Sequence, residues 1–281
     1  METPGGAPAA RTGEGLGDQL RDLRDHVRRL QEQVDALAAG HREGDERLST
    51  HIEGLDAVLG GGLPRGHVIA LHGPTGAMKT SLALYMMAKN RAAGRRGVFV
   101  SIEEGRDSIL RTMRGLGLGD AEDFVVDIGR LRLEHAGAED VRDWVEVLRD
   151  YLVRRREREP LSLVVIDSFN ALADLAHFRS PRRDVFHFVD FLRSTGMTTL
   201  VVVERSGEEA DAEDDLDRLA DGVLELRYSG AGEGRVHLLL RCVKMRHALH
   251  SRDYFVLAYE GGAFSIRPYG GASRSRWSRS G

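Results

Sequence analysis

The sequence predicts an α/β fold: a mostly parallel sheet flanked by helices and extended by antiparallel hairpins towards the C-terminus. Two observations predict this fold. Between residues 48 and 222, short apolar runs rich in β-branched residues alternate with helical stretches. From residue 222 to residue 268, strand–turn–strand patterns follow one another without helices. The first pattern is typical of parallel sheets and the second of antiparallel hairpins.

The individual elements follow from these patterns. The apolar runs predict parallel strands at 67–72, 97–102, 162–168 and 198–204. The stretches between them predict helices at 80–90, 138–156 and 180–196. Hairpin strands are predicted at 222–228, 235–243, 254–260 and 263–268. We expect these hairpins to be appended to an edge of the parallel sheet.

The N-terminal region differs from this core in composition. Residues 1–15 are rich in Gly, Pro and Ala, so we expect them to be disordered. Over residues 16–40, apolar residues recur at alternating spacings of four and three, which predicts a coiled-coil helix that favours a parallel dimer. An amphipathic helix folded back on its own domain remains the alternative. Gly40 and Gly44 end the helix and begin a linker to the domain at 48–268.

Composition excludes several classes of protein. The 281 residues are 41% hydrophobic and carry a net charge of −4, which is unlike an obligate nucleic-acid binder. The single cysteine excludes an intrachain disulfide and a cysteine-based zinc cluster. No secretory signal and no apolar run of roughly 18–20 residues is visible, so we expect a cytoplasmic protein without a membrane span. The basic tail 269–281 is expected to be flexible, with contact to nucleic acid or an anionic membrane as the alternative.

Lysine is rare in this chain. Of the 40 basic residues only three are lysines, namely Lys79, Lys89 and Lys244, and the other 37 are arginines. A lysine that persists in such a background is a candidate for a task that arginine cannot perform, such as placing a compact charge on a phosphate.

The segment GPTGAMKTS, residues 73–81, follows a predicted strand and opens a predicted helix. It matches the phosphate-binding pattern G-x-x-x-x-G-K-[ST], except that Met78 stands where the second glycine is expected. The backbone N–H groups of such a loop and the positive helix end bind phosphates. We expect Lys79 to contact the β- and γ-phosphates and Thr80 to hold Mg²⁺ through its hydroxyl. The predicted nucleotide-binding residues of this loop are Gly73, Pro74, Thr75, Gly76, Ala77, Met78, Lys79, Thr80 and Ser81.

Acidic residues stand at the carboxyl ends of three predicted parallel strands, where ligands bind in such sheets. Asp167 occupies the place of a Walker-B carboxylate on the Mg²⁺ shell. Glu103 and Glu104 are candidates for orienting or deprotonating the attacking water. Because neighbouring strand residues point to opposite faces, we expect only one of the two to face that water. Glu204 is a candidate sensor of the γ-phosphate.

Several segments together resemble the KaiC-like ATPases of the RecA/RadA superfamily. STHIEGLDAVLGGGLPRGHVIALHGPTGAMKTSLA is similar to their Walker-A segment, VSIEEGRDSIL to their catalytic-glutamate segment and LVVIDSFNAL to their Walker-B strand. The C-terminal strands, with the segment VKMR, are similar to their closing sheet. The resemblance covers about residues 48–268 and therefore one ATPase domain.

This resemblance implies a RecA-like core that assembles into a homo-oligomeric ring, expected to be a hexamer, with ATP bound between subunits. It implies that Glu103 and Glu104 form the catalytic pair and that Asp167 is the Walker-B residue. It further implies that Lys244 and Arg246 reach the γ-phosphate of the neighbouring subunit, which is the task of an arginine finger elsewhere.

Two residues depart from the family pattern. Met78 replaces the last glycine of the loop, and His247 replaces the glycine after KMR, which brings a titratable group near the expected site. The single ATPase domain also contrasts with the two tandem copies of KaiC, so a clock function is not implied.

Three functions are compatible with these features. The first is a slow ATPase that acts as a regulatory or assembly switch and signals to an unidentified protein partner. The second is a DNA-dependent ATPase of recombination or repair. We disfavour it because residues 204–221 carry nine acidic and two basic residues, which would repel a phosphate backbone. The third is an ATP-binding scaffold without hydrolysis, against which the retention of Lys79, Thr80, Glu103 and Asp167 argues.

Overall fold

The computed structural model describes residues 47–119, 122–127, 130–131, 144–176, 178, 180–205, 211–230 and 236–270. The chain divides into two units, residues 1–46 and residues 47–281, and every described residue belongs to the second unit. The predicted disordered segment 1–15, the predicted coiled-coil helix 16–40 and the tail residues 271–281 lie outside the described residues.

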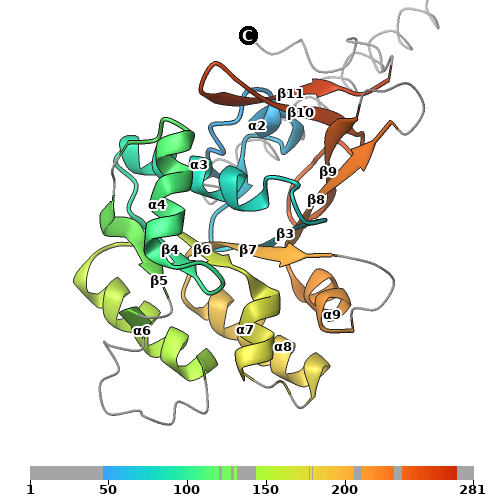
Figure 1. Ribbon diagram of the computed structural model, residues 1–281. Helices are drawn as coiled ribbons and strands as arrows, with labels where there is room; N and C mark the ends of the chain where they lie inside the picture. Colours follow the sequence, from blue (N-terminus) through green and yellow to red (C-terminus); the bar gives the residue numbers. More distant parts are fainter. Residues whose placement is uncertain are drawn as a thin grey trace, which may run out of the picture. The chain divides into compact units, whose positions relative to one another are not determined.

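A nine-stranded sheet of order β11-β10-β9-β8-β3-β7-β6-β4-β5 forms the centre of the second unit (Figure 1). Its parallel part consists of β3 (Val68–Gly73), β4 (Gly97–Ser101), β5 (Val125–Asp127), β6 (Leu163–Asp167), β7 (Thr198–Glu204) and β8 (Gly222–Ser229). The antiparallel strands β9 (His237–Met245), β10 (Phe255–Glu260) and β11 (Ala263–Pro268) extend it beyond β8. This arrangement confirms the predicted fold class. Strand β8 is parallel to β3 and antiparallel to β9, so the change of direction lies one strand later than the sequence pattern predicts.

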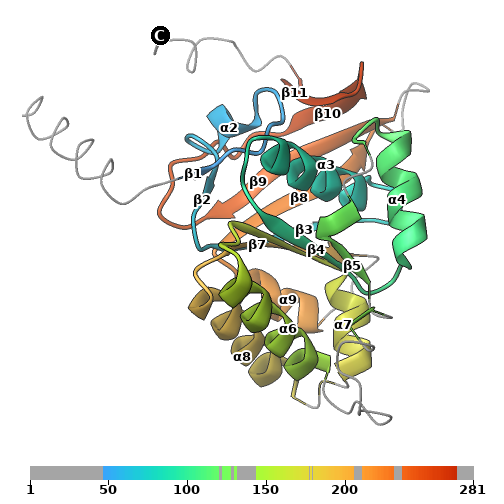
Figure 2. The same cartoon turned by 90° about the vertical axis from the view of Figure 1, so that its left-hand side faces the viewer.

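Helices cover both faces of this sheet (Figure 2). One face carries the short α2 (Leu55–Val58) together with α3 (Lys79–Ala92) and α4 (Arg106–Gly115). The other face carries α6 (Trp144–Arg158), α7 (Phe169–Ala176), α8 (Pro181–Ser194) and α9 (Asp211–Leu219). A 3-10 turn, η1 (Glu122–Phe124), precedes β5, and the strands β1 (Arg47–Leu48) and β2 (Leu63–Pro64) form a separate antiparallel pair. Among the described residues, no helix has the length and apolar character that crossing a bilayer requires.

Helix α9 is an element that the sequence patterns do not predict. It is formed by residues 211–219 of the acidic segment 204–221. The sequence hides this helix because most of its positions are acidic. Leu216 and Ala220, one turn apart, are nevertheless fully buried against the sheet, and this narrow apolar stripe stabilises the helix.

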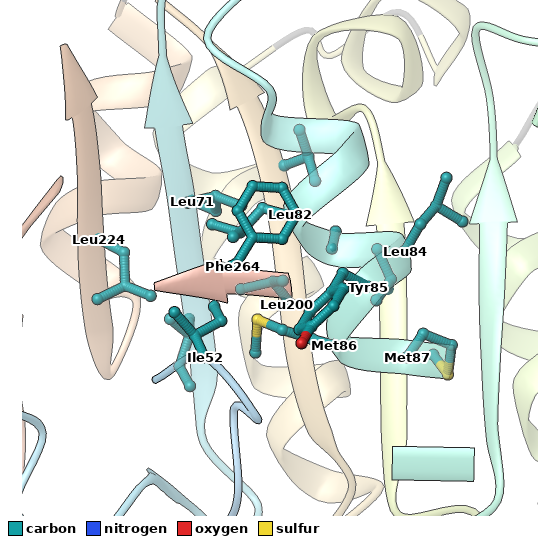
Figure 3. Packing of buried hydrophobic residues seen from close by; sticks show 14 of the residues in the cluster. Ile52, Leu71, Leu82, Leu84, Tyr85, Met86, Met87, Leu200, Leu224 and Phe264 are labelled. Carbon is teal, nitrogen blue, oxygen red and sulfur yellow. The ribbon is translucent and has the colours of Figure 1, made fainter. Parts of the chain in front are cut away.

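The apolar core explains why the loop after β3 has a fixed position. Successive residues of β3 alternate between the two faces: Ile69 and Leu71 pack on the side of α3, whereas Val68 and Ala70 pack on the side of α6–α9. Figure 3 shows the α3 side, where side chains of β3, β7, β8, β11 and α3 meet, among them Leu71, Leu200, Leu224, Phe264, Leu82, Tyr85 and Met86. Each fully buried leucine stabilises the fold by about 1.5–3 kcal/mol. The loop between β3 and α3 is therefore held at both ends by rigid elements.

Candidate active site at the carboxyl edge of the sheet

The loop from β3 to α3 presents an uncapped helix end. Gly73 closes β3, and a methyl group there would lie 2.7 Å from the Leu226 carbonyl oxygen, so only glycine fits beside β8. Met78 is the N-cap residue of α3, with a left-handed φ of 60°, and no side chain caps the helix. The first N–H groups of α3 therefore have no partner within the helix, and with the helix dipole they favour an anion.

Met78 adopts the backbone conformation that favours glycine, which is the residue the phosphate-binding pattern expects. Its side chain packs against the core cluster on the α3 face. This apolar contact offsets part of the strain of the left-handed conformation. The loop geometry is thus retained with methionine at this position.

Lys79 is nearly buried inside the loop, with 8% of its surface exposed. Its Nζ donates hydrogen bonds to the carbonyl oxygens of Gly73 and Pro74, each at 2.9 Å. Burial lowers the pKa of Lys79, although the carboxylates of Glu204, Asp167 and Glu103 act in the opposite direction. The ammonium group is therefore surrounded by loop carbonyls and strand-end carboxylates, at a place where phosphate oxygens can replace the carbonyls as acceptors.

Asp167 at the end of β6 is buried next to this loop. Burial raises its pKa to about 6, and the charges of Glu103 and Glu104 act in the same direction. A hydrogen bond from Thr80 and the charge of Lys79 act against this rise. The carboxylates of Asp167, Glu103 and Glu204 thus share the one ammonium of Lys79, and a divalent cation beside Thr80 and Asp167 would relieve their mutual repulsion.

The donor set fits Mg²⁺ bound together with a nucleotide. Among the described residues, no group of three or more His, Cys, Asp or Glu side chains forms a metal cage of protein ligands alone. Mg²⁺ is usually held by one or two carboxylates, waters and substrate phosphates rather than by such a cage. The hydrogen-bonded pair Thr80–Asp167 supplies the hydroxyl and the carboxylate for this arrangement.

Glu103 and Glu104 have different surroundings, although they are adjacent in sequence. The Glu104 carboxylate accepts a hydrogen bond of 2.6 Å from the Ser108 hydroxyl, and its backbone carbonyl accepts one of 2.6 Å from Ser101. Glu103 is exposed, and its charge acts on Lys79 as well as on Asp167. Glu103 is therefore the member of the pair whose carboxylate lacks the serine contact and interacts electrostatically with the loop.

Glu204 at the end of β7 bonds directly to the loop. The Thr75 hydroxyl donates a hydrogen bond to the Glu204 carboxylate. The Asn170 side chain holds the backbone of Glu204 from both sides, donating to its carbonyl oxygen at 3.0 Å and accepting from its N–H at 2.8 Å. Sequence reasoning missed Asn170, because it acts on a strand that is distant in sequence and only the fold brings the two together.

Lys244 and Arg246 lie elsewhere. Lys244 Nζ donates three hydrogen bonds to carbonyl oxygens at the C-terminal end of α9, those of Asp217, Arg218 and Ala220 at 3.1, 3.0 and 2.6 Å. This helix end lies at the opposite, amino edge of the sheet, since the next residue, Asp221, donates its N–H to the Val68 carbonyl at the start of β3. Within one protomer the described structure does not bring Lys244 to the loop.

Asp221 is a shared hydrogen-bond acceptor at the amino edge. It accepts hydrogen bonds from the Val68 N–H at 3.1 Å, from Arg193 Nη2 at 2.8 Å and from Arg246 Nη1 at 3.1 Å. His247, which follows Arg246, has a left-handed φ of 56°, and its ring meets His67 edge-on at 5.8 Å. The structure thus separates the predicted site residues into a carboxyl-edge group around Lys79 and an amino-edge group around Asp221.

Comparison with known proteins identifies the family. The family model described as "ATPase: KaiC" matches residues 48–268. The circadian clock protein KaiC3 of Synechocystis is 28% identical over 239 residues, which are 76% of this chain and 44% of KaiC3. The RecA protein of Rhodospirillum rubrum is 34% identical over 140 residues, which are 50% of this chain and 34% of RecA. The chain thus spans less than half the length of these relatives.

A solved structure supports the fold. The crystal structure of a KaiC-like protein from the hyperthermophilic archaeon Pyrococcus horikoshii matches with a TM-score of 0.68 and 23% identity. The match covers 80% of this chain and all of the archaeal chain, which shows a shared fold. Together with the family match over residues 48–268, it shows that the chain belongs to the KaiC family of ATP-binding ATPases with a RecA-like fold.

Proposed function

We propose that this chain binds Mg²⁺-ATP in the loop 73–81 and hydrolyses it slowly to ADP and phosphate. The proposal is supported above all by one observation: the nearly buried Lys79 and the Thr80–Asp167 pair meet at an uncapped helix end. Lys79 and the first N–H groups of α3 bind the β- and γ-phosphate oxygens. Thr80 and Asp167 would hold Mg²⁺, which would supply positive charge against the charge that develops on these oxygens.

Glu103 is proposed to orient the attacking water and to accept its proton, while Glu104, bonded to Ser108, supports it. The water oxygen attacks the γ-phosphorus, the bond between that phosphorus and the β,γ-bridging oxygen breaks, and ADP leaves. Glu204, whose carboxylate accepts a hydrogen bond from the Thr75 hydroxyl of the loop, is proposed to sense the γ-phosphate, which would compete for that hydroxyl.

We further propose that the site is completed by a neighbouring protomer in a homo-oligomeric ring, with a hexamer as the expected size. Asp167, Glu103 and Glu204 lie around Lys79, so the transition state of phosphoryl transfer would be stabilised by additional positive charge. Lys244 and Arg246 of the next protomer are proposed to supply that charge.

The ring is proposed to act as a regulatory or assembly switch that signals to a protein partner. The left-handed Met78 in the phosphate loop supports slow turnover, because a residue with a Cβ has fewer accessible backbone conformations there than glycine has. The predicted coiled coil at 16–40 is the proposed route to self-association or to the partner.

A DNA-dependent ATPase is the alternative, and the similarity to RecA over half of the chain favours it. The excess of acidic residues in 204–221 opposes it, because a polyanion would be repelled there. A titration with single- and double-stranded DNA at low salt, with and without ATP, separates the two. Tight binding that ATP strengthens would support the DNA-dependent enzyme.

Steady-state phosphate release tests the proposed hydrolysis. Wild-type protein is expected to release phosphate from ATP, and Lys79→Ala is expected to reduce the rate by about 100-fold or more, since the phosphate-binding ammonium is lost. Lys89→Ala is the matched control, because Lys89 stands on the same helix with its Nζ 5.2 Å from the Tyr85 ring. Equal rates for wild type and Lys79→Ala would refute hydrolysis at this loop. ATP binding without any phosphate release would identify a scaffold.

A further inference from the structure

The strand order gives the phosphate loop two different flanks. Loop residues 74–78 follow β3, and the strands β7, β6 and β4 lie on one side of β3. Their ends carry the carboxylates of Glu204, Asp167 and Glu103. Strand β8 lies on the other side of β3. A nucleoside triphosphate whose γ-phosphate lies at the carboxylates therefore directs its nucleoside away from them, towards β8.

Tyr228 stands on that second flank, near the end of β8. It shares a face of the strand with Leu224 and Leu226, which pack on the α3 side of the sheet. A methyl group at Gly76 would lie only 3.4 Å from the Tyr228 hydroxyl, so the phenol reaches the phosphate loop itself. Glycine at this position leaves the space between loop and ring open.

Tyr228 differs from the other tyrosines in being exposed and unengaged. It is 47% exposed, and within the described residues its side chain makes no hydrogen bond and no ring contact. Tyr85 and Tyr151 are buried. The remaining three are hydrogen-bonded: Tyr254 to Glu225, Tyr259 to the Leu116 carbonyl and Tyr269 to Ser229. An exposed aromatic ring beside a phosphate loop is a surface on which a base can stack.

We propose that Tyr228 is the nucleoside-binding residue of this site, with its ring stacked on the base of the bound nucleotide. The proposal rests on the proposed binding of ATP in the loop 73–81. Stacking needs the ring and not the hydroxyl, and it favours the larger purine bases because they offer more overlap. Tyr228 thus distinguishes a nucleotide from a bare polyphosphate, which the loop alone would bind equally well.

Calorimetric titration with two ligands, ATP and inorganic tripolyphosphate, tests the proposal. Tyr228→Ala is expected to weaken ATP binding on the order of tenfold and to leave tripolyphosphate binding unchanged. Tyr228→Phe is expected to bind ATP like the wild type. Tyr269→Ala, which removes another partly exposed tyrosine, is the matched control and is expected to change neither affinity. Thermal unfolding of each variant verifies that it is folded.

Two outcomes with Tyr228→Ala overturn the proposal. Unchanged ATP binding in Tyr228→Ala means that the base does not contact the ring. Equal weakening of ATP and tripolyphosphate means that Tyr228 supports the loop rather than the nucleoside. If wild type binds ATP and Lys79→Ala does not, the proposed function stands whatever Tyr228 does. If wild type does not bind ATP, both proposals fail.

Discussion

The two edges of the sheet shift the pKa of an aspartate in opposite directions. At the carboxyl edge, burial raises the pKa of Asp167 to about 6. At the amino edge, burial acts to raise the pKa of Asp221, but hydrogen bonds from Arg193 and from the Val68 N–H outweigh it and hold the pKa below its usual value. The charge of Asp221 is therefore balanced by arginines of its own chain, whereas Asp167 lies in a site with more carboxylates than cations.

This difference suggests how the protein is organised. The amino edge has surplus cations: Lys244 and Arg246 lie on the C-terminal carbonyls of α9, where a helix end favours positive charge. The carboxyl edge has surplus carboxylates around Lys79. Two edges of complementary charge on opposite sides of one protomer suit a head-to-tail ring, in which each contact joins unlike surfaces.

The largest expected effect concerns the amino edge. Lys244→Ala is expected to lower ATP hydrolysis by about 1,000-fold, the lower end of what a trans-acting cation contributes. ATP binding should persist, because the loop around Lys79 is unchanged. Phosphate release and calorimetric ATP binding measure the two properties, with Lys89→Ala as the control. Unchanged turnover would show that Lys244 serves only to cap α9.

Removing the carboxylate of the amino edge should have the next largest effect. Asp221→Ala removes the carboxylate that Arg193, Arg246 and the Val68 N–H share as an acceptor, so we expect a loss of about 2–3 kcal/mol in the free energy of unfolding. Urea denaturation measures it. Asp123→Ala removes an exposed ion pair with Arg91 and should cost less than about 0.5 kcal/mol. Similar losses for both variants would contradict the special role of Asp221.

Removing the Asp167 carboxylate at the carboxyl edge should increase stability, whereas removing that of Asp221 decreases it. Asp167→Asn is expected to raise the free energy of unfolding by about 1–2 kcal/mol at pH 7.5 without nucleotide, because a buried charge is removed. Hydrolysis should nevertheless be lost. A variant less stable than wild type at that pH would contradict the proposed charge deficit.

The two aspartates should also give opposite pH signatures. Between pH values of about 4 and 6 the folded protein retains a proton on Asp167 that the unfolded chain releases, so this group makes stability fall as pH rises. Asp221 contributes stability above the usual aspartate pKa, and that contribution is lost as pH falls through its lower folded pKa. Comparing urea denaturation of each variant with wild type from pH 3 to pH 8 isolates the two contributions.

The smallest expected effect concerns Met78. Met78→Gly should relieve about 1 kcal/mol of backbone strain, partly offset by lost packing, and should raise turnover a few-fold. His51→Gly removes another left-handed residue, with φ 56°, outside the loop and should leave turnover unchanged. Phosphate release measures both variants. Slower turnover in Met78→Gly would show that the loop needs the apolar packing of the methionine side chain more than it needs the backbone freedom of glycine.

Much of this architecture follows from the sequence. The apolar runs predict the parallel strands, and the scarcity of lysine by itself draws attention to Lys79 and Lys244. The contacts of Asn170 with Glu204 could not be predicted, because they join segments that only the fold brings together. The hydrogen bond from Ser108 to Glu104, which distinguishes Glu104 from Glu103, likewise could not be predicted, because no sequence pattern encodes it.

The central claim is that one active site combines the carboxyl edge of one protomer with the amino edge of the next. The direct test mixes Glu103→Gln and Lys244→Ala proteins, each inactive alone, and measures phosphate release. In randomly mixed rings about a quarter of the interfaces combine an intact carboxyl edge with an intact amino edge, so activity should return to about that fraction of wild type. No recovery, when native mass measurements show that mixed rings have formed, would contradict the shared site.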